Sequence, residues 1–230
     1  MTTRAFLLDI EGTTTPISFV HDVLFPYARE RFKSFLELNH DIADDLLRLQ
    51  QEHRDDVTAG NEPPALIEPY IYWLMDQDRK SSALKSLQGK IWKHGYHDGS
   101  LVSTVFADVP RAFQRWTEAG QPVSIFSSGS VLAQVLLFEH TNAGDLTKFI
   151  SHYFDTGIGK KIERSSYEKI AVELNLSTDE VHFVSDVVAE LDAAAEAGMK
   201  TSLCVRPGNP PQASSIRHQV IESFDEIAVQ

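Results

Sequence analysis

The spacing of apolar positions divides this chain into three stretches. A short apolar run, Phe6 to Leu8, stops at Asp9 and suits a strand that is buried on both faces of a parallel sheet. Between residues 17 and 99, apolar side chains recur every three or four positions, which predicts helices. From Val105 onward, short apolar runs alternate with helical patterns, which is typical of strands and helices that alternate along the chain.

These patterns predict the α/β class. We expect a doubly wound, Rossmann-like parallel sheet from residues 1–16 and 100–230, interrupted by an inserted all-helical cap at 17–99. Within the cap, the expected helices are 23–36, 41–58, 67–75 and 84–92. Within the sheet domain, we expect strands at 122–126, 150–154, 181–185 and 201–205, a last edge strand at 224–228, and helices at 110–119, 131–140, 165–174 and 188–197.

Composition narrows the class of protein. The 230 residues are 42% hydrophobic, which allows a large core, and the first apolar run is interrupted too early for a signal peptide or a membrane span. The single cysteine, Cys204, lies in an apolar run and suits a buried, inert thiol in a reducing cytoplasm. A net charge of -12 disfavours nucleic acid and anionic membranes as partners. We therefore expect a cytoplasmic protein that acts on a small molecule.

Four polar clusters follow predicted strands or precede predicted helices. Because the carboxyl ends of parallel strands share one edge of a sheet, side chains that are distant in the sequence can meet there. The clusters are Asp9 with Glu11, Ser127 with Ser128, Lys161, and Asp186 with Glu190.

Together these residue types fit phosphoryl transfer. Asp9 would be the oxygen nucleophile that forms an aspartyl-phosphate, and Glu11, two residues on, would handle a proton. Carboxylates of Asp9 and Asp186, with a backbone carbonyl near Glu11, would suit Mg²⁺, which prefers oxygen ligands. Lys161 would neutralise the transferring oxygens, and Ser127 would hydrogen-bond one of them.

Each cluster also has an ordinary structural interpretation. Ser127 and Ser128 suit a turn, Lys161 in a glycine-containing loop suits solvent, and Asp186 suits a helix cap. Their joint occurrence after successive strands favours the site. The loop that ends at Lys161 lacks the glycine spacing of a P-loop, and His94 with His97 has no nearby third ligand for zinc.

The motifs resemble those of the haloacid dehalogenase superfamily, and most closely its enolase-phosphatase branch, the acireductone synthases of methionine salvage. The run from Asp9 to Thr14 resembles the opening motif of that branch, in which glutamate replaces the usual second aspartate. The other matching segments are Ser127 to Ser130, Lys161, Ser185 to Val187 and the late loop Val205 to Asn209.

The resemblance implies a bifunctional enzyme that works as a monomer. It would enolise 2,3-diketo-5-methylthiopentyl 1-phosphate and hydrolyse the phosphate, giving the acireductone 1,2-dihydroxy-3-keto-5-methylthiopentene, with Mg²⁺ as cofactor. The implied roles are catalysis by Asp9, Glu11 and Lys161, substrate binding by Ser127, Ser128 and Lys161, and metal binding by Asp9, Glu11 and Asp186.

Three alternatives remain open at this stage. One is a phosphatase of the same superfamily that acts on another small phosphate ester without enolisation. The others are a dehalogenase that uses Asp9 on carbon, and a phospho-accepting signalling or binding module. The sequence leaves the role of Glu190 and the residues that bind the substrate tail undetermined, with Phe19, Phe25, Tyr70 and Trp73 as apolar candidates for the latter.

Overall fold

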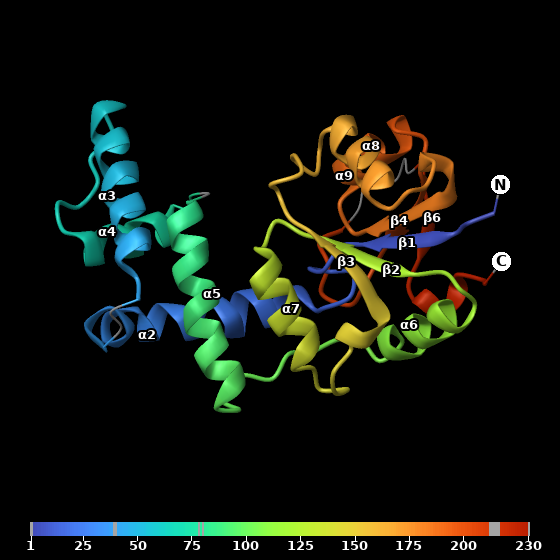
Figure 1. Ribbon diagram of the computed structural model, residues 1–230, viewed down its shortest axis with the longest axis horizontal. Coiled ribbons are helices and arrows are strands. Elements are labelled where there is room, and N and C mark those ends of the chain that lie inside the picture. Colours follow the sequence, from blue (N-terminus) through green and yellow to red (C-terminus); the bar gives the residue numbers. More distant parts are fainter. Residues whose placement is uncertain (1, 39–40, 78, 80, 212–216, 230) are drawn as a thin grey trace. The chain divides into compact units, whose positions relative to one another are not determined.

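The computed structural model describes residues 2–38, 41–77, 79, 81–211 and 217–229. It separates the chain into two compact units (Figure 1). The sheet unit comprises Met1–His21 and Val102–Gln230, and the helical unit comprises Asp22–Leu101. The boundaries that the sequence predicts, 16/17 and 99/100, lie a few residues before those of the two units.

The sheet unit is built on six parallel strands in the order β3-β2-β1-β4-β5-β6. This order, with β1 in the interior and crossovers to both sides, confirms the doubly wound α/β fold. The strands are β1 (Ala5–Leu8), β2 (Val123–Phe126), β3 (Ile150–Phe154), β4 (Val181–Ser185), β5 (Lys200–Cys204) and β6 (Gln219–Ile221). The helices are α6 (Val109–Glu118), α7 (Val131–Glu139), α8 (Arg164–Glu173) and α9 (Val188–Glu196), with 3-10 turns at Thr147–Phe149, Thr178–Glu180 and Phe224–Glu226.

Apolar side chains point to alternate faces of the sheet along β1, which explains why helices cover both faces. Phe6 stacks on Trp116 of α6, with 3.9 Å between ring centroids. Its neighbour Leu7 points to the other face and belongs to a cluster with Tyr167 of α8 and Leu191 of α9. Figure 1 shows α8 and α9 on one side of the sheet and α6 on the other. Burying each of these large side chains contributes about 1.5–3 kcal/mol to the stability of the fold. Because both faces of the sheet are apolar, polar chemistry is left to the ends of the strands.

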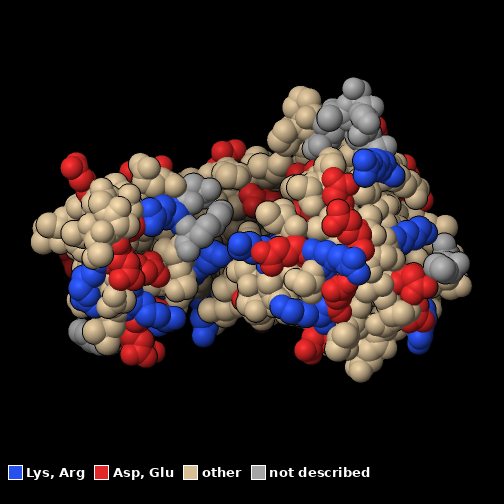
Figure 2. Space-filling model, turned by 90° about the horizontal axis from the view of Figure 1, so that it is seen from above, with Lys and Arg blue, Asp and Glu red and all other residues tan. Residues whose placement is uncertain are grey.

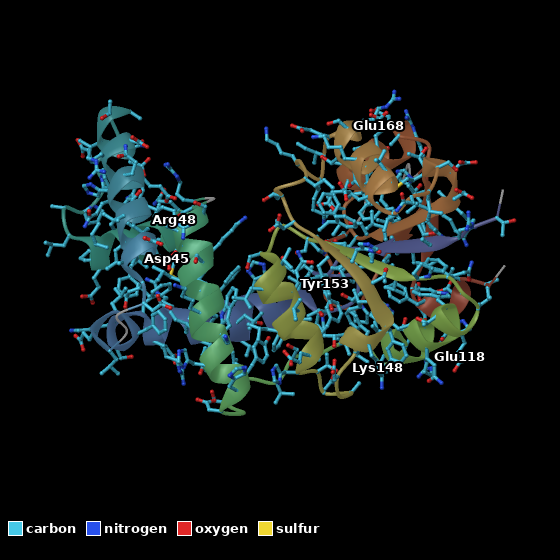
Figure 3. All side chains as sticks on the ribbon, in the orientation of Figure 1. Asp45, Arg48, Glu118, Lys148, Tyr153 and Glu168 are labelled. Carbon is cyan, nitrogen blue, oxygen red and sulfur yellow. The ribbon has the colours of Figure 1, made fainter. Side chains whose placement is uncertain are left out.

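The helical unit contains α2 (Phe25–Leu38), α3 (Ala43–Thr58), α4 (Ile67–Asp76) and α5 (Ser82–His97). The segment that leads into it forms a short helix, α1 (Ile17–Phe19), and a π-helical turn, Val20–Leu24. Asp45 lies one turn before Arg48 on α3 (Figure 3) and also pairs with Lys90 of α5 at 2.9 Å. The buried Asp45 carboxylate therefore ties α3 to α5.

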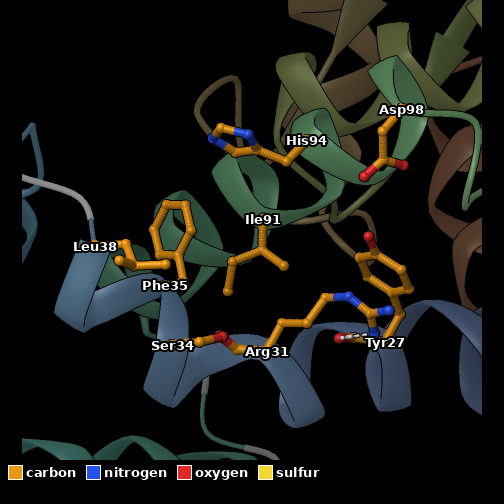
Figure 4. A pocket seen from close by; sticks show the side chains of 8 residues that line it. All are labelled: Tyr27, Arg31, Ser34, Phe35, Leu38, Ile91, His94 and Asp98. Carbon is orange, nitrogen blue, oxygen red and sulfur yellow. Dashed lines mark hydrogen bonds between the residues drawn. The ribbon is translucent and has the colours of Figure 1, made fainter.

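A groove of about 410 Å³ lies between α2 and α5 (Figure 4). The guanidinium of Arg31 lies 3.6 Å from the centre of the Tyr27 ring at one end of it. The ring of His94 meets the ring of Phe35 edge-on at 5.8 Å. The lining residues are Tyr27, Arg31, Ser34, Phe35, Leu38, Ile91, His94 and Asp98.

Two local predictions are wrong. Residues 224–228 do not form an edge strand, because Ser223 and Glu226 make a capping box that starts a 3-10 turn at Phe224. The carboxylate of Asp108 accepts the Phe224 amide at 2.6 Å, and β6 takes the edge position instead. Helix α8 begins at Arg164 without a serine cap, and Ser166 instead donates its hydroxyl to the carbonyl of Lys160.

The cysteine, the surface charges and the lengths of the helices further describe the protein. Cys204 is buried, and burial raises the pKa of its thiol to about 12, which makes it unreactive. Acidic and basic side chains are interspersed over the face of the molecule in Figure 2. Within the described residues, no helix is both long and apolar enough to cross a membrane.

Candidate active site

A buried lysine joins two carboxylates at the carboxyl edge of the sheet. Lys161 Nζ pairs with Asp9 Oδ1 and lies 2.6 Å from Glu190 Oε2. The Lys161 side chain is only 9% exposed, so the solvated interpretation of this residue is wrong. Glu190 also accepts a hydrogen bond from the hydroxyl of Ser185, at 3.0 Å. The structure thus assigns Glu190 a partner that the sequence left undetermined.

The loop before α8 presents Lys161. Tyr167 donates its hydroxyl to the Lys161 carbonyl at 2.6 Å, which ties the loop to α8. Burial lowers the pKa of Lys161, but the charges of Asp9 and Glu190 outweigh this effect and raise it. The lysine is therefore a fixed cation at neutral pH, as phosphoryl transfer requires.

A tight loop follows Asp9, the expected nucleophile, and surrounds its carboxylate. The carbonyl of Ile10 accepts the amides of Thr13, Thr14 and Thr15, at 2.9 to 3.2 Å. This turn brings the Thr13 hydroxyl to 3.4 Å from Asp9 Oδ2. We call residues 9–15 the nucleophile loop.

Gly12 lets the nucleophile loop lie against Asp186. Its φ of +69° belongs to the left-handed region, which favours glycine. A Cβ at this position would lie 2.7 Å from Cγ of Asp186, closer than real side chains pack. A larger residue would therefore push Asp186 away from the loop.

Asp186 does not cap a helix, and its charged form is disfavoured by its surroundings. Helix α9 is capped by Val187 without a side-chain hydrogen bond, so the capping interpretation of Asp186 is wrong. Burial, followed by the negative charges of Asp9 and Glu190, raises the pKa of Asp186 to about 7. Lys161 contacts two carboxylates, and their negative charges act on a third, Asp186; a divalent cation would relieve this repulsion.

The donor set fits an oxygen-preferring ion such as Mg²⁺. Asp9 and Asp186 offer carboxylate oxygens on neighbouring strand ends, because Leu8 pairs with Val184 in the sheet. Among the residues that the structure describes, no three His, Cys, Asp or Glu side chains gather so that they could hold a metal alone. Two carboxylates supplemented by a backbone carbonyl, waters and substrate phosphate remain consistent with this finding, because Mg²⁺ usually keeps several waters.

Glu11 points to a different neighbour. Its carboxylate lies 3.1 Å from Nε2 of His21, and both side chains are about half exposed. The backbone of Glu11 forms a bridge with Thr15 at the base of the nucleophile loop. The sequence analysis did not identify His21, which lies ten residues away in an exposed helical turn and carries no motif signal.

The two serines directly follow β2, the strand next to β1. Leu8 pairs with Ile125, so Ser127 follows β2 at the same edge as Asp9. The Ser127 hydroxyl accepts the amide of Gly129 at 3.2 Å and shapes the turn, while Ser128 is exposed. Ser130 caps α7 by accepting the amide of Ala133. The sheet register is thus what brings Ser127 to this edge.

The four apolar candidates for the substrate tail have different environments. Tyr70 is fully buried, and its hydroxyl donates to Asp56 at 2.7 Å, so it is a core residue. Phe19 is buried in the sheet unit rather than in the helical unit. Phe25 and Trp73 are partly exposed and retain surface that a ligand could contact.

Comparison with known proteins agrees with this geometry. A family model for haloacid dehalogenase-like hydrolases matches residues 3–198. The enolase-phosphatase E1 of Synechococcus elongatus is 50% identical over 230 residues, which cover 96% of each chain. The enolase-phosphatase E1 of Leptospira borgpetersenii is 44% identical, again with 96% of each chain covered.

Solved structures share the fold over nearly the whole chain. The UTR4 protein of Saccharomyces cerevisiae is 36% identical, with a TM-score of 0.81 over 98% of this chain and all of the other. A dehalogenase that is 19% identical has a TM-score of 0.57 and supports the fold alone. The resemblance read from the strand-end motifs is confirmed, and this chain belongs to the haloacid dehalogenase-like hydrolases.

Proposed function

We propose that this chain is an enolase-phosphatase of methionine salvage, an acireductone synthase. Its substrate is 2,3-diketo-5-methylthiopentyl 1-phosphate, and its products are the acireductone and inorganic phosphate. The observation that carries the proposal is 50% identity to a protein named enolase-phosphatase E1 across 96% of both chains. The buried contact of Lys161 with Asp9 and Glu190 supports it with matching chemistry. The names of the relatives do not favour the other open functions.

The phosphatase step uses Asp9 as the nucleophile. One Asp9 carboxylate oxygen bonds to phosphorus while the bond from phosphorus to the substrate oxygen breaks, and the leaving oxygen takes a proton. Water then attacks the phosphorus of the aspartyl-phosphate and frees both inorganic phosphate and Asp9. Lys161 neutralises charge on the transferring oxygens, and Ser127 and Ser128 hold them by hydrogen bonds.

Asp9, Asp186 and Glu11 are proposed to hold Mg²⁺, with Glu11 contributing its carbonyl or its side chain. When bound, the ion would neutralise phosphate charge and the charge that develops on the substrate carbonyl during enolisation. The helical unit, predicted at 17–99, is proposed to act as the cap domain. We also expect a cytoplasmic monomer, and sedimentation of the purified protein would check its monomeric state.

Enolisation needs a base, and Glu11 is our candidate. Its carboxylate is more exposed than that of Asp9 and lies 3.1 Å from Nε2 of His21. Both half-reactions would be measured in Glu11→Gln, following the enol phosphate by absorbance and phosphate by release. Loss of enolisation is expected, whereas enolisation at the wild-type rate would exclude Glu11 as the base.

The proposed function is tested by turnover of the diketo phosphate with Mg²⁺. Wild-type protein should form a phosphorylated enol and then release phosphate, and chelation with EDTA should abolish the reaction until Mg²⁺ is restored. Asp9→Asn should lower phosphate release by about 10³-fold or more, because it removes the nucleophile. Asp44→Asn, an exposed change on α3, is the control. Phosphate release without an enol intermediate would instead indicate the phosphatase of another ester.

A further inference from the structure

The loop that follows β5 hydrogen-bonds to the nucleophile loop through Arg206 and Asn209. Asn209 donates Nδ2 to the carbonyl of Gly12 at 2.9 Å, and Arg206 donates Nε to the carbonyl of Thr13 at 3.1 Å. Both contacts join segments that are almost two hundred residues apart. The conformation of the nucleophile loop therefore depends on these two side chains.

The partners of Arg206 hold its whole guanidinium in place. Its Nη2 pairs with Asp108 at 2.9 Å, and its Nη1 donates to the carbonyl of Glu222 at 2.9 Å. The guanidinium also lies over the rings of Phe106 and Phe224. With Nε on Thr13, each of its three nitrogens has an acceptor, so Arg206 acts as a brace.

Asn209 differs because one of its atoms is unused. Its Nδ2 lies between two carbonyl acceptors, those of Gly12 and Cys204 at 3.3 Å. Turning the amide over would place an oxygen against two oxygens, so the orientation of the side chain is determined. Oδ1 must point away from both carbonyls. It is buried and has no hydrogen-bond partner among the residues that the structure describes.

The position of this unused acceptor is informative. A Cβ on Gly12 would lie 3.0 Å from Asn209 Oδ1 and 2.7 Å from Cγ of Asp186. The amide oxygen and the Asp186 carboxyl group therefore approach the same glycine and lie within a few ångströms of each other. A buried acceptor without a donor is unfavourable, which favours a donor that arrives with a ligand.

We propose that Asn209 is a positioning residue for the reaction, with its Oδ1 accepting a hydrogen bond from a water molecule in the shell of a divalent cation held at Asp9 and Asp186. The inference rests on the metal site of the proposed function. Nδ2 sets the nucleophile loop through Gly12, and Oδ1 orients the ligand shell from the other side. Groups that orient metal ligands in this way typically change affinity by 10- to 100-fold.

The test is Mn²⁺ binding by the metal-free full chain, followed by the electron paramagnetic resonance signal of free Mn²⁺ and by competition with Mg²⁺. Asn209→Ala removes both donor and acceptor and should weaken Mn²⁺ binding about tenfold. Asn209→Asp loses the donor but keeps an acceptor, so its affinity should equal or exceed that of the wild type. Gln114→Ala, a surface amide on α6, should leave the affinity unchanged.

Two outcomes would overturn the proposal. Wild-type affinity in Asn209→Ala would show that Oδ1 contributes nothing to the ion. Equal weakening in Asn209→Ala and Asn209→Asp would show that the residue is only a brace, because both variants lose the contact with Gly12. Circular dichroism checks folding, and Asn209→Ser provides a second truncation if Asn209→Ala does not fold.

Turnover separates this inference from the proposed function. At saturating Mg²⁺, Asn209→Ala should lower kcat several-fold with little change in KM, because the nucleophile loop is displaced while the phosphate contacts remain. A wild-type protein that binds Mn²⁺ but does not process the diketo phosphate would refute the proposed function and leave the role of Asn209 standing. A wild-type protein that binds no Mn²⁺ would refute both.

Discussion

Both units of this chain bury carboxylates, and they treat them in opposite ways. In the helical unit, Asp56 accepts hydrogen bonds from Tyr70 at 2.7 Å, Asn61 at 2.8 Å and Arg79 at 2.5 Å. Burial would raise the pKa of Asp56, but these donors lower it below its usual value. In the sheet unit, burial and neighbouring negative charge raise the pKa of Asp186 to about 7.

The difference separates a carboxylate that stabilises the fold from one that is held ready for a ligand. Asp56 has enough donors to remain charged without help. Asp186 is buried close to the negative charges of Asp9 and Glu190, so carboxylates repel one another at the carboxyl edge of the sheet unit. Such clusters of carboxylates with shifted pKa values occur preferentially at functional sites, where a bound ligand can offset the repulsion. Changes at the two sites should therefore separate activity from stability.

Removal of the lysine should have the largest effect on the sheet unit. Lys161→Met leaves buried carboxylates without their cation, so we expect phosphate release to fall about 10²- to 10³-fold. We also expect the free energy of unfolding to drop by about 3 kcal/mol, measured by urea denaturation. The matched control is Lys160→Met, because the Lys160 side chain is 77% exposed. Similar losses in both variants would contradict the assigned role of Lys161.

Glu190→Gln should affect activity more than stability. The change removes one of the neighbouring negative charges, which reduces their repulsion. It also removes one of the two ion pairs that position Lys161, the other being with Asp9. We expect phosphate release to fall about 10- to 100-fold while the free energy of unfolding changes by less than about 1 kcal/mol. Glu196→Gln, an exposed change on the same helix, is the control. A stability loss as large as that of Lys161→Met would mean that Glu190 is chiefly a structural residue.

Asp56→Asn should show the opposite pattern. The amide cannot accept from three donors as the carboxylate does, so the free energy of unfolding should fall by about 2–3 kcal/mol at pH 7. Because folding lowers the pKa of Asp56, this stability is present above the unfolded pKa of about 3.9 and is lost as the pH falls through the folded value. Wild type and variant should therefore converge in strong acid. The exposed Asp55→Asn is the control, and a difference that persists at low pH would contradict this explanation.

The sequence predicted the parts of the site that follow strands. Asp9, Ser127 and Asp186 come directly after predicted strands, and parallel strands bring their ends to one edge. The edge strand was harder to predict, because Phe224 is an apolar residue whose amide is captured by Asp108, over one hundred positions away. Periodicity carries no information about such long-range contacts.

Partners that depend on loop geometry were also beyond prediction. The contact of His21 with Glu11 arises in a helical turn at a unit boundary, and that of Asn209 with Gly12 requires two loops to meet. The late loop from Val205 to Asn209 was visible as a family feature, but spacing alone could not say which of its atoms faces the nucleophile loop. These contacts become visible only once the strands are in register.

The smallest effect should come from a buried group of the sheet unit that lies outside the site. His182 on β4 is 1% exposed, and its Nε2 lies 2.8 Å from the hydroxyl of Ser202. Burial, with a smaller contribution from Lys200, lowers the pKa of His182 to about 3. The histidine is therefore neutral in the folded protein, whereas the unfolded chain takes up a proton below about pH 6.5.

The sign of the effect follows from this difference. The contribution of His182 to stability is complete above pH 6.5 and is lost as the pH falls toward 3. At pH 5 the loss is about 2 kcal/mol. Urea denaturation of wild type and His182→Gln at pH 8 and pH 5 would measure it, with His152→Gln, an exposed residue on β3, as the control. The wild type should lose about 2 kcal/mol more than His182→Gln between the two pH values. Equal losses would mean that buried groups other than this histidine carry the acid sensitivity of the sheet unit, and the contrast between the units would then rest on their carboxylates alone.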